Sequence, residues 1–374
     1  MTPVRYHVGR FPPEDLDLHR LVPLIGPAHA AVAGYEGMLL GLSNANVLMS
    51  PLVYQEAVFS NRIEGTQTTL TEILTFEAEG NLFDDSTPEK ANSWEVLNYR
   101  KALYAAVDQL KDIPLSQRLI RDTHEVLMQG VRGQHKAPGK YRRFLDDCWI
   151  GPPGSTIETA RYIPCPADLL TGAMDALESY IHVVTPDPLV QLAILHAEFE
   201  AIHPFQDGNG RMGRLLVPLF MLAKGLLPSP SFYISEYLDG HHEMYYERLL
   251  AVSRDNDWTG WCAFFLAALT EQARSNQKKI TELLDLYDEL KERIVEATRS
   301  QYSGWTLDWI FKRPIFQTTD FVNGAGIPEP TARRILRVLR GDGLLRELRK
   351  TRGRRPAMLA FADLLNIVEG RLEF

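Results

Sequence analysis

The chain has 374 residues, of which 45% are hydrophobic and 24% charged, and its formal net charge is −8. This composition is typical of a folded, water-soluble protein of two or three domains and argues against a disordered chain. The N-terminus lacks the pattern of a signal peptide, and no run of about 18 apolar residues predicts a membrane span. We therefore expect a cytoplasmic protein without a membrane partner.

Charge is distributed unevenly along the chain. Residues 331–356 contain nine arginines and one lysine against Asp342 and Glu347, a local net charge of +8. The rest of the chain must then carry −16. The three cysteines, in contrast, are widely spaced and lack the short paired spacings of zinc or redox sites.

The first well-marked element is a helix at about residues 50–65. Ser50 is the expected N-cap, Pro51 occupies the first helical position, and Gly65 follows the end. From about residue 90 to 180 the pattern is mostly helical, with an interruption at residues 144–165. There, residues 148–150 and 161–163 flank a connection rich in Gly and Pro, which predicts a short exposed hairpin.

Two apolar helices are expected at residues 188–202 and about 214–224, and the segment HPFQDGNGRMGR lies between them. Pro204 disfavours helical geometry at His203, so the imidazole should lie at a helix end, where it could titrate near neutral pH. Further helices are expected from residue 240 to about 298.

The loop between these two helices has the residues of a phosphate site. Gly208, Asn209 and Gly210 are small enough for backbone N–H groups to converge on an anion at the start of the next helix. Arg211 and Arg214 are three residues apart, so both guanidinium groups could reach a polyphosphate from one side. A structural histidine followed by an ordinary turn is the alternative. The combination of residues nevertheless favours nucleotide binding, although neither the P-loop nor the dinucleotide motif occurs.

The twelve residues 203–214 match the Fic signature His-Pro-Phe-x-[Asp/Glu]-Gly-Asn-Gly-Arg-x-x-Arg without a departure, so the chain resembles Fic domain proteins. That family mostly transfers AMP from ATP to a hydroxyl side chain of a target protein. The resemblance implies that His203 is the catalytic base, that Phe205 anchors the loop in the core, and that Asp207 holds Mg²⁺ or Mn²⁺. The implied ATP and phosphate contacts are Gly208, Asn209, Gly210, Arg211, Met212, Gly213 and Arg214, the last of which would reach the γ-phosphate.

A second motif resembles the family's inhibitory helix, whose pattern is [Ser/Thr]-x-x-x-Glu-[Gly/Asn]. Ser60 and Glu64 are four residues apart on the helix at about 50–65, hence on one face, and Gly65 follows. By resemblance, Glu64 would pair with Arg214 and compete with the γ-phosphate. A solvent-exposed glutamate before a C-cap glycine is the alternative.

Two more segments resemble parts of Fic proteins. The hairpin, within residues 150–163, would be the flap that clamps an extended segment of the target through main-chain hydrogen bonds. Tyr246, with Tyr245 next, would contact the nucleoside, although each could equally belong to the core.

The C-terminal part resembles a winged helix-turn-helix. A short helix begins at residues 319–322, and arginines line the exposed side of the next helix. Residues 344–348 and 358–361 flank an Arg-rich tip. DNA binding through residues 319–356 and a protein or homodimer contact are both open.

The sequence thus predicts a mostly α fold with a Fic-type helical core, a short β-hairpin flap and a C-terminal winged-helix domain. The expected parts are an N-terminal helical region (1–110), a catalytic core (111–275), a linker helix (276–300) and the winged helix-turn-helix (301–374). The predicted function is an ATP- and Mg²⁺-dependent protein adenylyltransferase restrained by Glu64. Removal of AMP by the same site, or a DNA-binding regulator with a nucleotide-sensing site, are the alternatives.

Overall fold

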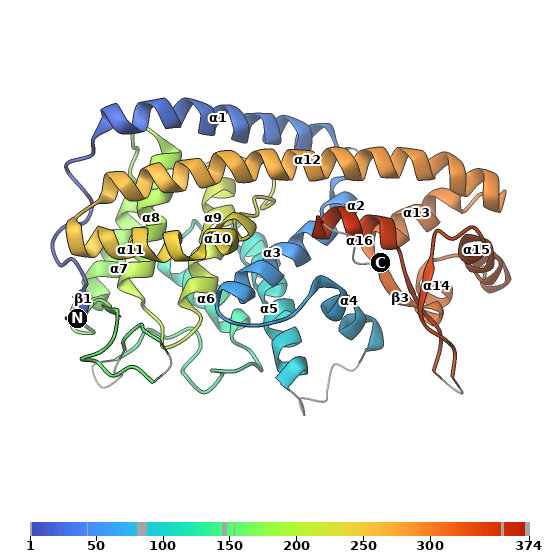
Figure 1. Cartoon of the computed structure of the whole chain (residues 1–374), viewed down its shortest axis with the longest axis horizontal. Coiled ribbons are helices and arrows are strands. Elements are labelled where there is room, and N and C mark those ends of the chain that lie inside the picture. The colour runs from blue at the N-terminus through green and yellow to red at the C-terminus, as the bar shows by residue number, and fades with distance from the viewer. Residues whose placement is uncertain are drawn as a thin grey trace.

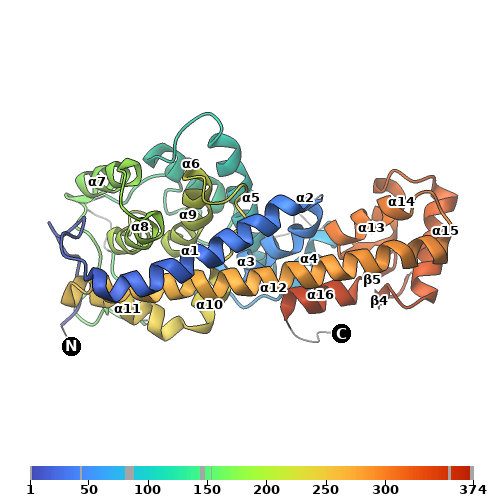
Figure 2. The ribbon, with the colours of Figure 1, turned by 90° about the horizontal axis from the view of Figure 1, so that it is seen from above.

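The computed structural model describes residues 2–42, 44–80, 88–143, 148–152, 154–352 and 355–370. Helices make up most of these residues, and their strands form two small sheets. The molecule is elongated, with its two longest helices running along one side (Figures 1 and 2). The mostly helical fold expected from the sequence is confirmed. Within the described residues, no helix combines the length and the apolar character needed to cross a membrane.

The two long helices are α1 (Leu18–Gly41) and α12 (Trp258–Thr298), which pack along each other. Helix α12 has 41 residues and joins the N-terminal two thirds of the molecule to the C-terminal part (Figure 2). The linker helix expected at residues 276–300 is therefore the second half of α12 and not a separate element. No proline interrupts the sequence there, and Ile280, Leu283 and Leu290 keep one face buried.

Helices α2 (Ala45–Leu48), α3 (Ser50–Ile63), α4 (Leu70–Glu79) and α5 (Pro88–Gln109) follow α1. The expected N-cap at Ser50 is wrong, because the chain enters α3 directly from α2 and Met49 already has helical angles. The far end of α3 agrees with the sequence, since Gly65 follows it with a φ of +86°.

The middle of the chain forms α6 (Gln117–Leu127), α7 (Leu170–His182), α8 (Pro188–Ile202), α9 (Asn209–Ala223), α10 (Ser235–Gly240) and α11 (His242–Asp255). Helices α8 and α9 pack against each other and are buried on nearly all sides. Helix α9 begins at Asn209, inside the HPFQDGNGRMGR segment, and not near residue 214 as its apolar run suggested. The segment therefore joins two helices that are fixed in the core.

The flap differs from the predicted hairpin. Its first arm contributes only an isolated antiparallel bridge from Ile150 to Tyr162. Strand β2 (Tyr162–Ile163) pairs on its other side, in parallel, with the N-terminal strand β1 (Val4–Arg5). Both sides of β2 are therefore occupied, and only the outer side of the segment around Ile150 is left for another strand. Residues 144–147 and 153 of the predicted flap region lie outside the described residues.

The C-terminal part contains α13 (Ser303–Lys312), β3 (Ile315–Gln317), α14 (Thr318–Gly324), α15 (Glu329–Gly341), β4 (Arg346–Arg349), β5 (Met358–Ala360) and α16 (Ala362–Glu369). The strands form an antiparallel sheet in the order β3-β5-β4. The expected helices and small sheet are present, although residues 353–354 at the tip are not described. Helix α16 packs on α3, and β3 packs on α4.

Candidate nucleotide-binding site

The loop between α8 and α9 turns sharply at two residues. His203 caps α8 in the left-handed conformation, with φ 51° and ψ 62°, and Pro204 follows it. Gly208 is also left-handed, with φ 77°, and directly precedes α9. The prediction that the helix ends at His203 is confirmed, and the N-terminus of α9 faces the loop as expected for an anion site.

Two side chains hold this loop in shape. Asn209 accepts a hydrogen bond from the Phe205 backbone N–H and donates one to the Phe205 carbonyl, both at 2.8 Å. The Phe205 ring is fully buried and stacks on His124, with 3.6 Å between ring centroids. His124 Nε2 lies 2.8 Å from the Asp207 carbonyl oxygen. The expected anchoring role of Phe205 agrees with this packing, while the Asn209 side chain shapes the loop and leaves anion contacts to the backbone.

The His203 imidazole is a neutral group in this environment. Burial lowers its pKa to about 4, and the nearby Arg142 lowers it further, while Glu64 opposes the shift. The expectation that His203 titrates near neutral pH is therefore wrong for this structure, because burial disfavours the charged form. A neutral imidazole has a free ring nitrogen at pH 7 and can accept a proton.

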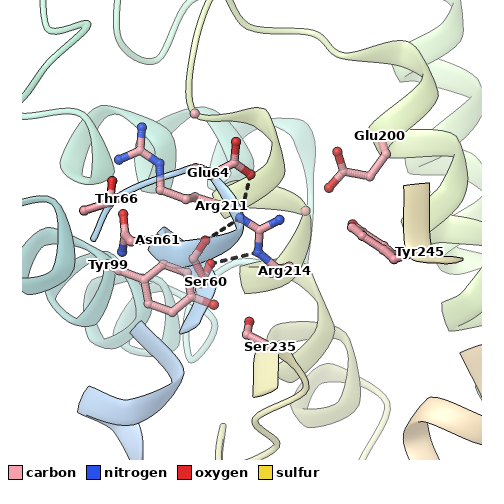
Figure 3. A network of polar contacts seen from close by, with 12 residues as sticks. Ser60, Asn61, Glu64, Thr66, Tyr99, Glu200, Arg211, Arg214, Ser235 and Tyr245 are labelled. Atoms are coloured by element: carbon pink, nitrogen blue, oxygen red, sulfur yellow. Dashed lines mark hydrogen bonds and ion pairs between the residues drawn. The ribbon is translucent and has the colours of Figure 1, made fainter. Parts of the chain in front are cut away.

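Arg214 is held by the C-terminal end of α3. Its Nε donates to Ser60 Oγ at 2.9 Å, and its Nη2 donates to the Ser60 carbonyl at 2.8 Å and to Glu64 Oε1 at 2.7 Å (Figure 3). Arg214 is 1% exposed, whereas the Glu64 side chain is 33% exposed. Burial raises the pKa of Glu64, but the charge and hydrogen bond of Arg214 outweigh burial and lower it. The pair predicted from the sequence is thus formed and ionised.

Arg211 does not accompany Arg214, contrary to the expectation from their spacing. Its guanidinium extends away from Arg214 (Figure 3), and Nη1 lies 3.5 Å from Glu95 Oε2 on α5. Glu95 Oε2 also accepts a hydrogen bond from the Thr66 hydroxyl at 2.9 Å. Arg211 turns toward α5 because tertiary packing places the buried carboxylate of Glu95 beside the first turn of α9.

Asp207 is the candidate metal ligand of the loop. Its side chain is 27% exposed, its Oδ1 accepts from the Gly208 N–H, and its Oδ2 lies 3.0 Å from Lys136 Nζ. Among the described residues, no cluster of three or more His, Cys, Asp or Glu could hold a metal ion. A single carboxylate still fits Mg²⁺, which usually takes its other ligands from water and substrate phosphates.

A cavity of about 520 Å³ opens beside the loop. Groups from the end of α3, from α8, from the loop and from the first two turns of α9 line it, namely Glu64, Glu200, His203, Gly210 and Arg214. The flap and α11 complete its wall, with Ile150, Gly151, Pro152, Arg161, Tyr162, His242, Tyr245, Tyr246, Leu249 and Leu250 among the lining residues. Its volume and its mixed apolar and polar wall suit a nucleotide-sized ligand.

The two candidate tyrosines are placed differently. Tyr245 is 1% exposed, and its hydroxyl lies 2.9 Å from His196 Nε2, so it belongs largely to the core. Tyr246 is only partly buried and packs against His242, with 4.6 Å between ring centroids. Of the pair, Tyr246 is therefore better placed to meet a nucleoside, which remains a prediction.

Two models of one protein family match the chain. The model described as "Fic/DOC family N-terminal" matches residues 22–108, and the model described as "Fic/DOC family" matches residues 114–221. Together they cover just over half of the chain. The chain belongs to the Fic/DOC family. The second match ends within α9, so it includes the whole HPFQDGNGRMGR segment.

Relatives of the chain include named adenylyltransferases. A probable protein adenylyltransferase of Aquifex aeolicus is 29% identical over 120 residues, which is 32% of this chain and 33% of the relative. The protein adenylyltransferase Fic of Drosophila erecta is 27% identical over 224 residues, which is 58% of this chain and 40% of the relative. The chain thus matches well under half the length of either.

The fold of a solved Fic family protein from Desulfovibrio desulfuricans is similar over nearly the whole chain. The TM-score is 0.57 at 21% identity, with 91% of this chain and 95% of the other covered. This likeness shows the shared fold.

Some residues at the Fic/DOC site are absent from the sequence-based prediction. Glu95 and Lys136 reach the loop from α5 and from the segment after α6, which local sequence does not reveal. Glu200, in contrast, carries a local signal. It lies on the last turn of α8, three residues before His203, and both residues line the same cavity.

Proposed function

We propose that this chain is a protein adenylyltransferase, which transfers AMP from ATP to a hydroxyl group of a target protein. One observation above all supports the proposal. A single nucleotide-sized cavity brings together His203, the backbone of Gly210 at the start of α9, and Arg214. A base, an anion-binding helix terminus and a cation are the groups that such a transfer needs.

The proposed reaction is an in-line displacement at the α-phosphorus. The target oxygen forms a bond to phosphorus, the bond from phosphorus to the oxygen bridging to the β-phosphate breaks, and pyrophosphate leaves. The hydroxyl proton passes to the neutral imidazole of His203. The negative phosphates of bound ATP would raise the low pKa of His203, which favours this proton transfer.

The rest of the site would bind and orient the nucleotide. Backbone N–H groups at Gly208–Gly210 and the dipole of α9 would hold phosphate oxygens. Asp207 would bind Mg²⁺, which neutralises phosphate charge when bound, once Lys136 gives up its ion pair. Tyr246 and the flap residue Ile150 would enclose the nucleoside. The outer side of the flap would bind the target segment.

We also propose that Glu64 and Ser60 restrain the enzyme. Together they occupy Nε and Nη2 of Arg214, so the guanidinium would not be free for the γ-phosphate. ATP would then bind with its α-phosphate badly placed for attack. The restraint is intramolecular, because α3 belongs to the same chain.

The test uses ATP labelled on the α-phosphate, with Mg²⁺ and with or without cell lysate. Wild type, Glu64→Gly and Glu64→Gly/His203→Ala would be compared as purified proteins. We expect strong protein labelling by Glu64→Gly, little by wild type and none by the double variant. Thermal unfolding of all three serves as the folding control.

Other outcomes would redirect the assignment. Equal labelling by Glu64→Gly and wild type at saturating ATP would contradict the restraint. No labelling under any condition would contradict AMP transfer. Removal of AMP from a modified protein by wild type would then favour the reverse activity at the same site.

A nucleic-acid regulator is the second candidate, and the exposed arginines of α15 favour it. Arg333, Arg337 and Arg340 all lie on the solvent side of this helix. Arg333 and Arg340 already pair with Glu329 and Glu347, which reduces the charge available for phosphates.

Duplex DNA of random sequence tests this candidate. If it applies, binding at low salt should weaken steeply as salt is raised, because counterion release drives it. Arg337→Ala should then weaken binding by roughly threefold to tenfold, as the loss of about one phosphate contact predicts. No binding at low salt would contradict this function and leave a protein contact as the role of this part.

A further inference from the structure

Glu200 has a largely buried carboxyl group, and one of its oxygens lacks a hydrogen-bond partner among the described residues. Its side chain is 10% exposed, and Oε1 forms no hydrogen bond within the described part of the chain. Other buried glutamates are well satisfied. Glu56 accepts hydrogen bonds from the Ser235 N–H, the Ser235 hydroxyl and the Tyr99 hydroxyl. A buried carboxyl oxygen left unpaired is costly, so the isolation of Glu200 needs an explanation.

The carboxyl group of Glu200 faces the nucleotide cavity. Glu200 is among the residues that line this cavity, and Figure 3 shows it opposite Glu64, with Arg214 lying between the two. Gly213 leaves room for it, because a side chain on Gly213 would clash with Glu200 Oε1. A side chain on Gly210 would likewise clash with the carboxylate of Glu64. The first two turns of α9 thus have a place for each of two carboxyl groups.

The groups around Glu200 make its charged form unfavourable. Glu64 from α3 repels it, Arg214 from α9 attracts it, and the hydroxyls of Tyr245 and Tyr246 come from α11. On α8, His196 Nε2 lies 3.9 Å away, and burial keeps both His196 and His203 neutral at pH 7. Burial raises the pKa of Glu200 to about 7, Arg214 lowers it, and Glu64 raises it.

A bound nucleotide would shift this balance further. Its phosphates bring negative charge into the same cavity and engage Arg214, the group that favours the ionised carboxylate. An ionised Glu200 would repel the phosphates, whereas a neutral carboxyl group has an O–H donor to offer. An ATP molecule is rich in acceptors, since its phosphate and ribose oxygens all accept hydrogen bonds.

We propose that Glu200 is a further nucleotide-binding residue, which binds in its neutral form by donating a hydrogen bond to an oxygen of the nucleotide. The inference rests on the proposed function, because it requires a nucleotide in this cavity. Glu200 takes up a proton as the nucleotide enters. Nucleotide affinity therefore falls as pH rises between the pKa of Glu200 in the free protein and its higher pKa in the complex.

The test measures binding of Mg²⁺ and α,β-methylene-ATP, which cannot release pyrophosphate, by calorimetry from pH 6 to pH 8.5. The parent is Glu64→Gly, and it is compared with Glu64→Gly/Glu200→Gln. The amide introduced by Glu200→Gln donates a hydrogen bond at every pH and so imitates the neutral carboxyl. Glu64→Gly/Glu243→Gln, which changes an exposed residue at the start of α11, is the matched control.

We expect the parent and the Glu243→Gln control to lose affinity with rising pH, by up to about tenfold per pH unit more than the Glu200→Gln variant. The difference between the Glu200→Gln variant and the parent should be smallest at pH 6, and the loss of Glu64, which raises the pKa of Glu200, moves the range of pH dependence in the parent to lower pH. Glu64→Gly/Glu200→Ala should bind roughly fivefold more weakly at pH 6, because it lacks the donor. Differences between variants exclude the titration of the nucleotide itself, which is common to all.

Three results would overturn the inference. Identical pH profiles for the parent and the Glu200→Gln variant would show that Glu200 takes up no proton. Weaker binding by the Glu200→Gln variant at every pH, with a parent affinity that rises with pH, would make Glu200 an ionised ligand of the metal. Failure of the parent to bind any nucleotide would overturn the proposed function as well. Calorimetry of the parent in two buffers of different ionisation enthalpy also measures the number of protons taken up on nucleotide binding, and this experiment needs no substitution at Glu200.

Discussion

The guanidinium of Arg214 is the group around which the site is arranged. It is almost fully buried, and three acceptors from α3 and its C-terminal end satisfy its Nε and Nη2. A buried guanidinium without acceptors would be strongly unfavourable. Any release of Glu64 therefore needs a new partner for Arg214, and the γ-phosphate of ATP is a suitable one. In the proposed enzyme, competition between Glu64 and the γ-phosphate for Arg214 would act as the switch.

The contribution of Ser60 can be separated from that of Glu64. Ser60→Ala removes the acceptor of Arg214 Nε but leaves the Ser60 carbonyl and Glu64 in place. A hydrogen bond to a charged group contributes about 1.5–3 kcal/mol, so we expect AMP transfer roughly tenfold above wild type and below Glu64→Gly. Initial rates with α-labelled ATP measure this, with Ser179→Ala on α7 as control. If Ser60→Ala transferred AMP at the wild-type rate, Ser60 would make no contribution to the restraint and Glu64 would act alone.

At the scale of elements, the flap depends on the N-terminal segment. Strand β1 pairs with β2, and the residues after β1 are anchored beneath it. His7 Nε2 lies 2.7 Å from Glu198 Oε2 on α8, its Nδ1 lies 2.7 Å from Ser253 Oγ on α11, and all of these groups are buried. The N-terminal segment, which is far from the HPFQDGNGRMGR segment in the sequence, therefore holds in place the flap edge at which a target would dock.

Val4→Pro tests this dependence. The Val4 N–H donates to the Arg161 carbonyl at 3.1 Å, and proline has no N–H to donate. We expect about fivefold faster hydrogen exchange at residues 148–165, as the loss of one backbone hydrogen bond predicts. In the Glu64→Gly background, labelling of lysate proteins should fall by a larger factor than ATP affinity, because the flap docks the target and forms only part of the cavity wall. Val4→Ala keeps the N–H and is the control, and equal exchange in both variants would contradict the dependence.

At the scale of the whole molecule, the C-terminal part is built against the helix that leads to Glu64. Gln55 on α3 donates to the Val368 carbonyl on α16 and accepts from Lys279 of α12 at 2.8 Å. Arg349 on β4 pairs with Glu79 on α4. Helix α12 continues through both halves without a break. Such shared elements should make the two halves unfold together.

Gln55→Ala measures this coupling. The change leaves the Val368 carbonyl without its donor and removes one acceptor of Lys279, so we expect a loss of about 1–3 kcal/mol in the free energy of unfolding. Urea unfolding followed by circular dichroism and by tryptophan fluorescence should give coincident single transitions. Gln134→Ala, at an exposed position, should be nearly neutral. Two separate transitions would mean that the halves are independent.

The features that depend on local geometry could be predicted from the sequence. The end of α8 at His203 follows from Pro204, the turn at Gly208 needs a residue that tolerates positive φ, and the spacing of Ser60 and Glu64 places both on one helix face. Such features depend on residues a few positions apart.

The pairing of residues that are distant in the sequence could not be predicted and is seen only in the folded chain. The fold brings Arg211 to Glu95 on α5, pairs β1 with β2, and leaves Glu200 Oε1 without a hydrogen bond from any described residue. It also lowers the pKa of His203, since burial depends on what packs around the loop. These outcomes arise from contacts between distant segments, whose geometry and desolvation no local pattern encodes.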